Sequence, residues 1–189
     1  VKTMADMSLD DIERLESLVE NILLASKIES ANFRLNKELI DLSSITKNIF
    51  DRIRIKFKGQ RNFRSQIEDN VYFYGDRFSF SSVIYNLIEN AIKYSGKGAE
   101  ISVELRGDDK NIYLRITDTG IGIPEMEKGK IFGRFYRIGT EETRKTKGTG
   151  LGLFIVNQVV MMHSGKIEVK NNDPVGSIFE ITIPVGTAA

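Results

Sequence analysis

The sequence predicts a two-layer α+β sandwich, in which a mixed, mainly antiparallel sheet is covered by three helices and preceded by a long helix. The strand candidates follow one another mainly as hairpins, and three amphipathic segments between them must cover one face of the resulting sheet. A βαβ alternation with a dinucleotide fingerprint is missing, which argues against a doubly wound fold.

Length, charge and residue counts exclude several kinds of site and partner. The 189 residues suffice for one full domain with a short appendage, or for two small domains. A net charge of +1 predicts no strong electrostatic attraction to nucleic acid or anionic lipid. The chain has no cysteine and one histidine, His163, so disulfides and cysteine- or histidine-based metal clusters are excluded. No apolar run reaches the ~18 residues of a membrane span, and a start at Val1 inside a helical pattern leads us to expect a piece of a longer protein.

Residues 8–30 are predicted to form the long helix, because apolar residues recur at spacings of three and four. These are Leu9, Ile12, Leu15, Val19, Ile22 and Leu23. The stripe is narrow and has no partner nearby in sequence, so we expect it to pack on another helix, either upstream or in a second copy. Docking on its own domain is the alternative. Residues 31–38 interrupt the stripe and are predicted to be a connector.

The first half of the sandwich begins with a short segment at 38–42. Ser43 or Ser44 is the expected cap of a helix ending near Gly59. Two strand candidates follow, at 63–67 and 71–74, and a second helix is predicted at 77–94 from its apolar periodicity.

The second half begins with two strands, 100–105 and 111–117, joined by a hairpin turn. The chain is then irregular to about residue 150, with a helical piece near 125–130, and a stretch this long inside a compact domain predicts a functional lid. The predicted elements then end with a third helix at 151–163 and a hairpin formed by 166–170 and 177–185.

Four polar residues share one face of the second helix: Asn86, Asn90, Lys93 and Tyr94, at offsets of 0, 4, 7 and 8. A carboxamide oxygen is a suitable ligand for Mg²⁺, an amine can meet a phosphate, and a phenol can contact a sugar or base. The alternative is a solvated helix face, but such faces favour Lys and Glu over paired Asn.

Two glycine-containing segments flank the lid. Residues 118–124 (Asp-Thr-Gly-Ile-Gly-Ile-Pro) leave a strand in a turn that lets a ligand approach the carboxylate of Asp118, or else form an ordinary glycine-rich loop. Residues 147–153 (Lys-Gly-Thr-Gly-Leu-Gly-Leu) lead into the third helix, where free amides make an anion site suited to a polyphosphate. The second segment is not a Walker A loop, because no Gly-Lys pair is followed by Ser or Thr.

Between these segments lies 131–137 (Ile-Phe-Gly-Arg-Phe-Tyr-Arg), whose aromatic residues we expect to anchor the lid in the core. The cations beyond it, Arg144, Lys145 and Lys147, are expected to face bound phosphates. For Arg144 and Lys145 a basic solvent loop is the alternative.

In this order the four features resemble the ATP-binding catalytic domain of sensor histidine kinases, within the GHKL superfamily. Residues 86–95 resemble its N box, 118–124 its G1 box, 131–137 its F box and 148–153 its G2 box. The resemblance covers about 38–185, and residues 8–30 resemble the second helix of the family's dimerisation and phosphotransfer hairpin. It implies two domains, 1–34 from that hairpin and 38–189 for ATP binding, with a lid at about 125–150.

The resemblance also implies roles. Asp118 would accept from the adenine amino group beside Gly120 and Gly122, Asn90 would hold Mg²⁺, and Lys93 and Tyr94 would flank the phosphates. The implied nucleotide-binding residues are Asn86, Asn90, Lys93, Tyr94, Asp118, Gly120, Gly122, Ile123, Phe132, Arg137, Lys147, Gly148, Thr149, Gly150, Leu151 and Gly152.

Related ATPases and serine kinases carry Glu four residues before the metal-binding Asn, as a base. Here that place is Asn86, which cannot take a proton, and Glu89 is expected to point off this face. We therefore expect a histidine kinase; a GHKL ATPase and a non-catalytic nucleotide-binding module are the alternatives.

The resemblance places the phosphorylated histidine upstream of Val1 and makes His163 structural. The implied partners are ATP, a phosphoacceptor helix of the same or the partner protomer, a response-regulator receiver domain and a second copy in a homodimer. It implies the cytoplasmic part of a membrane-anchored sensor.

Overall fold

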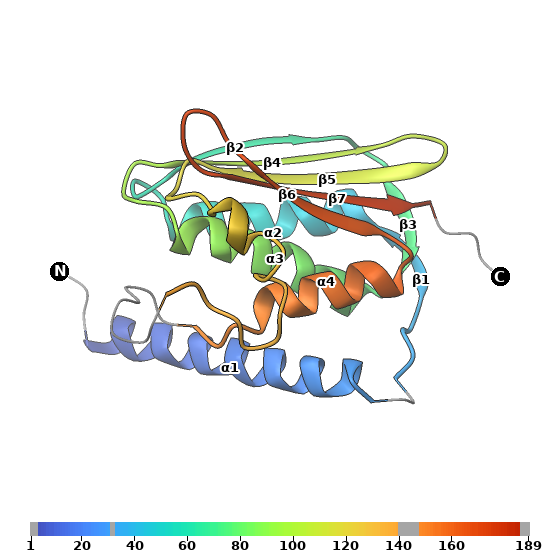
Figure 1. The fold of residues 1–189 in the computed structure, drawn as a ribbon, viewed down its shortest axis with the longest axis horizontal. Helices are drawn as coiled ribbons and strands as arrows, with labels where there is room; N and C mark the ends of the chain where they lie inside the picture. Colours follow the sequence, from blue (N-terminus) through green and yellow to red (C-terminus); the bar gives the residue numbers. More distant parts are fainter. Residues whose placement is uncertain (1–3, 31–32, 140–147, 186–189) are drawn as a thin grey trace.

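The protein was analysed as a computed structural model, which describes residues 4–30, 33–139 and 148–185, without the side chains of 4–11, 13, 14 and 17. Figure 1 shows a sheet above a layer of helices, with a long helix beneath that layer. The helices of the described ranges are α1 (Met4–Ile28), α2 (Leu42–Lys56), α3 (Arg77–Lys93) and α4 (Gly152–Met162), with a single 3-10 turn at Glu125–Glu127. The strands there are β1 (Glu38–Asp41), β2 (Asn62–Ile67), β3 (Tyr72–Gly75), β4 (Glu100–Gly107), β5 (Asn111–Asp118), β6 (Lys166–Asn171) and β7 (Ser177–Pro184).

Five of these strands form the main sheet, in the order β2-β4-β5-β7-β6. β4, β5, β7 and β6 pair antiparallel, whereas β2 runs parallel to β4. β1 and β3 form a separate antiparallel pair. The predicted two-layer α+β class with a mixed, mainly antiparallel sheet is therefore confirmed, and so are the three covering helices α2, α3 and α4 (Figure 1).

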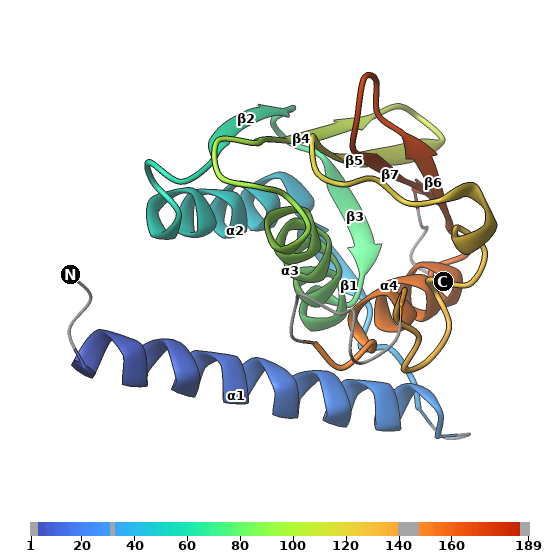
Figure 2. The ribbon, with the colours of Figure 1, turned by 60° about the vertical axis from the view of Figure 1, so that its left-hand side comes forward.

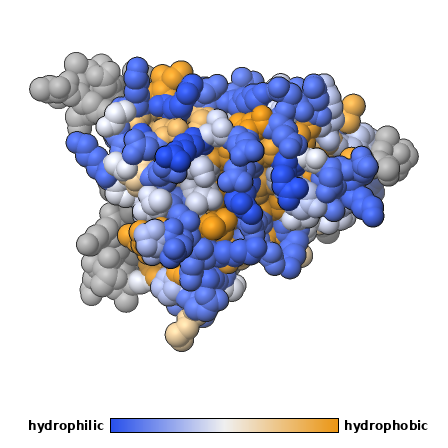
Figure 3. Space-filling model, turned by 90° about the horizontal axis from the view of Figure 1, so that it is seen from above, coloured by the Kyte–Doolittle hydropathy of each residue, from blue (hydrophilic) through white to orange (hydrophobic). Residues whose placement is uncertain are grey.

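Alternation along the strands fixes which face meets the helices. Ile101, Val103 and Leu105 of β4 are buried, as are the matching apolar positions of β5 and β7. The outer face carries an ion-pair ladder in which Arg115 binds Glu104 and Glu180 at 3.4 and 2.6 Å. Seen from above in Figure 3, this side of the molecule is mainly hydrophilic. The sheet thus has one core face and one solvated face.

The cap of α2 differs from the expectation. Asp41 is the N-cap, and its carboxylate accepts from the Ser44 amide at 2.9 Å. The Ser43 hydroxyl instead donates to the Glu68 carbonyl at 2.6 Å and accepts from the Val71 amide. The prediction of Ser43 or Ser44 was therefore wrong, because Ser43 is used for a tertiary contact that no local pattern reveals.

α1 begins four residues earlier than predicted, and it docks on its own domain. Leu24 and Ala25 are buried against the core, and Figure 2 shows the helix crossing beneath α3 and α4. Much of its apolar stripe stays more than half exposed, namely Ile12, Leu15, Val19, Ile22 and Leu23. Among its described side chains, the helix therefore has one docked side and one exposed apolar side. Among the described helices none is long and apolar enough to cross a membrane.

His163 closes the C-terminal end of α4 as a buried residue, 4% exposed between Phe73 and Phe80. Its Nδ1 lies 2.7 Å from the Val159 carbonyl, and its Nε2 accepts from the Asp76 amide at 3.2 Å. Those partners fix a neutral ring with the proton on Nδ1. Burial lowers the pKa of His163. This is a structural histidine, as expected.

Candidate functional site

A cavity of about 290 Å³ opens where α1, α3 and the start of α4 meet the segment 131–137. Its lining consists of Leu18, Asn21, Asn86, Glu89, Asn90, Lys93, Tyr94, Ile131, Tyr136, Arg137, Gly148, Thr149, Gly150, Gly152 and Leu153. This size lies at the lower end of the usual range for small-molecule sites. The polar face of α3, the end of the aromatic segment and the glycine run therefore share one hollow.

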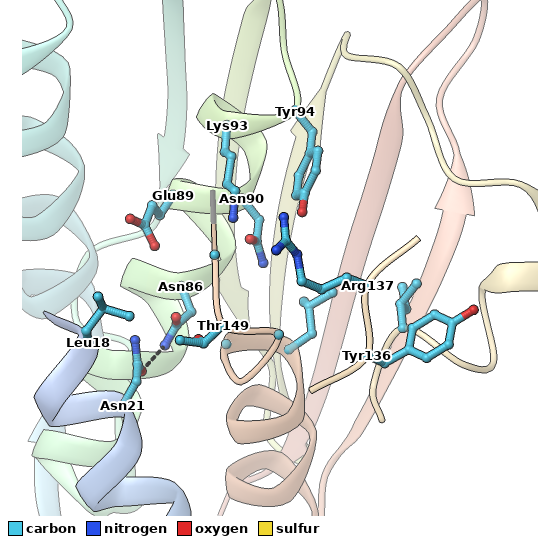
Figure 4. A pocket seen from close by; sticks show the side chains of 15 residues that line it. Leu18, Asn21, Asn86, Glu89, Asn90, Lys93, Tyr94, Tyr136, Arg137 and Thr149 are labelled. Carbon is cyan, nitrogen blue, oxygen red and sulfur yellow. Dashed lines mark hydrogen bonds between the residues drawn. The ribbon is translucent and has the colours of Figure 1, made fainter. Parts of the chain in front are cut away.

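The four polar residues of α3 behave as the helix spacing predicts. Asn90, Lys93 and Tyr94 lie on one wall, and the guanidinium of Arg137 points toward them (Figure 4). The ammonium of Lys93 lies 5.3 Å from the centre of the Tyr94 ring, a cation–π contact. This wall presents a carboxamide, a phenol and two cations to one space, which suits a phosphorylated ligand.

Asn86 lies deeper, 3% exposed. Its amide donates to the carbonyl and hydroxyl oxygens of Ser82 at 2.9 and 3.1 Å, and to Asn21 Oδ1 at 3.3 Å. The dashed line in Figure 4 marks the last of these contacts, which joins α3 to α1. Asn86 therefore lines the floor of the cavity while its side-chain amide is held by α3 and α1.

The glycine run approaches its neighbours too closely for side chains. A Cβ on Gly150 would lie 2.6 Å from the carbonyl carbon of Phe135, and the φ of Gly150 is +75°. A Cβ on Gly152 would lie 2.7 Å from Asn86 Oδ1, and one on Gly148 would meet the Lys93 ammonium. α4 begins at Gly152, one residue later than predicted, and its N-cap gives no side-chain hydrogen bond to the first turn. The start of α4 thus lies at the cavity, and the amides of its first turn have no side-chain cap.

The turn after β5 stands next to the cavity and outside its lining. Asp118 is 4% exposed and accepts from the Gly120 amide at 2.8 Å. Burial raises the pKa of the Asp118 carboxyl, which the amides of Gly120 and Ser177 oppose by donating to it. The Ile121 amide donates to the Tyr94 carbonyl at 3.2 Å, so the turn is fastened to the end of α3.

The expectation that the aromatic residues of 131–137 anchor this segment in the core is met only in part. Ile131 is buried, and Phe132 and Tyr136 pack on the core. Phe135, by contrast, is exposed beneath the Arg134 guanidinium, and Arg134 reaches Glu29, the residue after α1, at 2.8 Å.

The structure brings together many of the predicted site residues in the cavity lining, namely Asn86, Asn90, Lys93, Tyr94, Arg137, Gly148, Thr149, Gly150 and Gly152. Those outside the lining are Asp118, Gly120, Gly122, Ile123, Phe132 and Leu151. Lys147 lies outside the described residues, as do Arg144 and Lys145.

Six lining residues were not predicted: Leu18, Asn21, Glu89, Ile131, Tyr136 and Leu153. Ile131 and Tyr136 belong to a segment that had been singled out, and Leu153 to the glycine run. Glu89 was expected to point off this face, yet it lines the exposed edge, with its carboxylate turned away from Arg137 in Figure 4. Leu18 and Asn21 had no signal in the sequence, because only the docking of α1 places them there.

The donor set at the cavity suits a divalent cation held jointly with phosphates. Across the described ranges no three or more His, Cys, Asp or Glu side chains gather into a metal cluster. Asn90 nevertheless offers a half-buried carboxamide oxygen to the cavity. Mg²⁺ takes few protein ligands and keeps waters and substrate phosphates, so this sparse set fits it.

Residues 75–187 match the family described as histidine kinase-, DNA gyrase B-, and HSP90-like ATPase. The chain is 33% identical over 178 residues to the sensor histidine kinase WalK of Bacillus subtilis, covering 93% of this chain and 29% of WalK. It thus spans less than a third of that relative's length.

Solved structures extend the comparison. The mycobacterial sensor histidine kinase MprB superposes with a TM-score of 0.70 and 32% identity, over 78% of this chain and 97% of that one. Histidine kinase ThkA, solved in complex with response regulator protein TrrA, gives a TM-score of 0.70 and 25% identity, over 96% of this chain and 50% of that one.

Proposed function

Because the chain belongs to the histidine kinase-, DNA gyrase B-, and HSP90-like ATPase family, we propose that it is the ATP-binding catalytic part of a sensor histidine kinase. It would position ATP and Mg²⁺ for transfer of the γ-phosphoryl group to a histidine that this chain does not contain, and onward to a response-regulator aspartate. The observation that carries the proposal is the convergence of the Asn90–Tyr94 wall and the amides of the glycine run on one cavity.

The phosphates are assigned to the end of the cavity lined by Lys93, Arg137 and residues 148–150 and 152. Two cations and the backbone amides of a helix start supply charge and directed donors there. Phosphoryl transfer depends mainly on such positioning and charge stabilisation. By its place next to Gly148 in the sequence, Lys147 would add a third cation to this set.

The base is assigned to the turn beside Tyr94. The Asp118 carboxylate would accept from an adenine amino group, with Gly120, Gly122 and Ile123 forming the wall around it. Asp118 lies at the end of β5 and is joined through Ile121 to Tyr94, the residue shared with the cavity. A nucleotide lying along Tyr94 would place its base at the Asp118 turn and its phosphates at the glycine run.

Asn90 is the proposed protein ligand of Mg²⁺. The metal, when bound, would neutralise charge on the phosphates. Asn86 would fasten α3 to α1, because its amide donates to Ser82 in its own helix and to Asn21 in α1.

One observation favours a second candidate, a GHKL ATPase: Glu89 is a carboxylate at the edge of the cavity. Against this, the position that carries the catalytic Glu in such ATPases is Asn86, and a carboxamide cannot accept the proton of an attacking water. A kinase that transfers to an already nucleophilic imidazole needs no such base.

The partners follow from the same assignment. We assign α1, within residues 1–34, to the second helix of a dimerisation and phosphotransfer hairpin, whose exposed stripe would pack on the first helix and on a second copy. Residues 38–189 would form the ATP-binding domain, with its lid at about 125–150. The ThkA–TrrA complex supports a response regulator as partner. Such a kinase would work on the cytoplasmic side of a membrane-anchored sensor.

The test is transfer of radiolabel from γ-labelled ATP to a supplied phosphoacceptor helix pair. We expect label on that pair and none on the chain itself, because both ring nitrogens of His163 are engaged. Asn90→Ala should abolish Mg²⁺-dependent binding and transfer, whereas Asn48→Ala, on an exposed position of α2, should not.

Three outcomes separate the candidates. Phosphate release that ignores the helix pair would favour the ATPase. ATP binding without transfer would favour a non-catalytic module. Label on His163 would refute the assignment of the acceptor to another segment.

A further inference from the structure

We propose that Arg61 is a positioning residue for the nucleotide site, holding the end of α3 that presents Lys93 and Tyr94. This inference rests on the proposed function. Arg61 lies outside the cavity lining and makes no direct contact with the space assigned to ATP.

The Arg61 guanidinium bridges three carbonyls from two parts of the chain. Its NH2 group donates to the carbonyls of Ile92 and Ser95, at 3.3 and 2.7 Å, and its NH1 group donates to its own neighbour Gln60 at 3.0 Å. Ile92 and Ser95 bracket the last residues of α3. A cation at this place also opposes the partial negative charge of the helix end.

The bracketed residues are the ones that the site uses. Lys93 and Tyr94 line the cavity, and the Tyr94 carbonyl accepts from Ile121 in the turn that carries Asp118. Ser95 is buried, and a Cβ on Gly120 would lie 2.9 Å from its hydroxyl oxygen. Arg61 therefore supports, from behind, the junction between the phosphate wall and the base-recognising turn.

Arg61 is reached from a second cavity, of about 370 Å³, on the other side of this junction. That cavity is also lined by Arg54, Lys58 and Arg64. Arg54 pairs with Asp51 at 3.0 Å and Arg64 with Glu100 at 3.1 Å, both at exposed positions. Arg61 differs from them, because its charge is directed at backbone carbonyls.

Two buried side-chain atoms lack a hydrogen-bond partner in the part of the chain that the structure describes, and both stand at this junction: Arg61 Nε and Ser95 Oγ. A buried donor without a partner is costly, so the hydrogen bonds from the guanidinium to the three carbonyls are what keep it in this place. A guanidinium also presents its donors in a rigid fork that a lysine cannot reproduce.

The experiment measures the affinity of the chain for ATP, ADP and adenosine by isothermal titration calorimetry, with thermal melting in parallel. Arg61→Ala should weaken all three by a similar factor, about tenfold, which corresponds to losing the hydrogen bonds of one charged group. Arg64→Ala is the matched control, a cation of the same cavity, and should change affinity by less than about twofold, as for an exposed pair.

Chemical rescue distinguishes positioning from a loss of fold stability. The second cavity would admit millimolar methylguanidinium to the space left in Arg61→Ala, and we expect it to restore most of the affinity. Methylammonium at the same concentration should not. General destabilisation would not respond to the shape of the added cation.

Should Arg61→Ala not fold, Arg61→Lys takes its place. It keeps the charge and loses the fork, and we expect a smaller loss of affinity in the same direction. Unchanged affinity in the folded variant, or a loss that methylguanidinium leaves as it is, would overturn the role of Arg61 alone. If the parent chain itself bound no adenine nucleotide, the proposed function would fall first.

Discussion

The side-chain amide of Asn86 in α3 donates to the side-chain oxygen of Asn21 in α1 over 3.3 Å. Through this contact a helix from the start of the chain takes part in the wall of the candidate nucleotide site. Leu18, one turn earlier on α1, lines the same cavity, and Glu29 near its end binds Arg134. The position of α1 and the shape of the site are therefore linked through named contacts.

That link predicts an energetic coupling between Asn21 and Asn86. In a double-mutant cycle with alanine at each position, we expect a coupling of about 0.5–1 kcal/mol in the free energy of unfolding, the usual value of one hydrogen bond. Chemical denaturation of the parent and three variants measures it. Additive effects would mean that α1 does not rest on α3 in solution.

Gly150 is expected to tolerate no side chain. Gly150→Ala places a Cβ against the Phe135 backbone in a left-handed conformation, so we expect a loss of about 1–3 kcal/mol in stability, with weakened ATP binding. Gly129→Ala is the control, since no atom lies within 4 Å of its added Cβ. Thermal melting and calorimetric titration check both. Equal behaviour of the two variants would contradict the close approach.

The Asp118 carboxylate is expected to lower the stability of the ligand-free fold and to favour the binding of adenine. Burial raises the pKa of its carboxyl in the folded state, so the folded chain binds the proton more tightly than the unfolded chain does. Its contribution to stability is then lost as pH rises above the ordinary value of 3.8. Asp118→Asn should remove that pH-dependent loss and stabilise the ligand-free protein at pH 7, while abolishing the preference for adenine.

The measurement for Asp118→Asn is thermal melting of parent and variant over a pH series, with binding of ATP and GTP at neutral pH. The stability difference should grow with rising pH. A constant difference would mean that the carboxyl is not desolvated, and a retained preference for ATP would end its assignment to the base.

His163 gives a pH dependence of the opposite sense. Its pKa is lowered by burial, so the unfolded chain takes up the proton first, and stability should fall as pH drops through the unfolded value of 6.5. Because the chain has one histidine, its imidazole signals in an NMR titration are unambiguous. We expect a midpoint below 6.5. A midpoint at or above that value would refute the buried neutral ring.

Periodicity predicted the local structure well, because burial imposes it residue by residue. The four polar residues of α3 were placed on one face by spacing alone, and all four line the cavity. The glycine run could be recognised from its residue types, because Gly150 and Gly152 stand where side chains cannot fit. Burial of a helix face and lack of space for a side chain are local constraints, so the residue types at those positions reveal them.

Contacts between segments that are distant in the sequence could not be predicted in this way. The parallel pairing of β2 with β4 depends on chain path, and the alternation in β2 indicates only which side chains face the core. The docking of α1 depends on Leu24 and Ala25 fitting against the core, so Asn21 and Leu18 could not be foreseen at the site. Ser43 has the right residue type for a cap, but its hydroxyl forms hydrogen bonds with Glu68 and Val71, in the turn between β2 and β3.

The short connection between α1 and β1 has a consequence for binding strength. Residues 29–37 join the helix to the sandwich, and the last of them are fastened, with the Asn36 amide donating to Asp76 and the Lys37 ammonium to the Met162 carbonyl. A tether of this length keeps a released helix at a millimolar effective concentration. Contacts as modest as one side-chain hydrogen bond, one exposed ion pair and the burial of Leu24 and Ala25 then suffice for α1 to return. A free peptide of the same sequence would compete poorly.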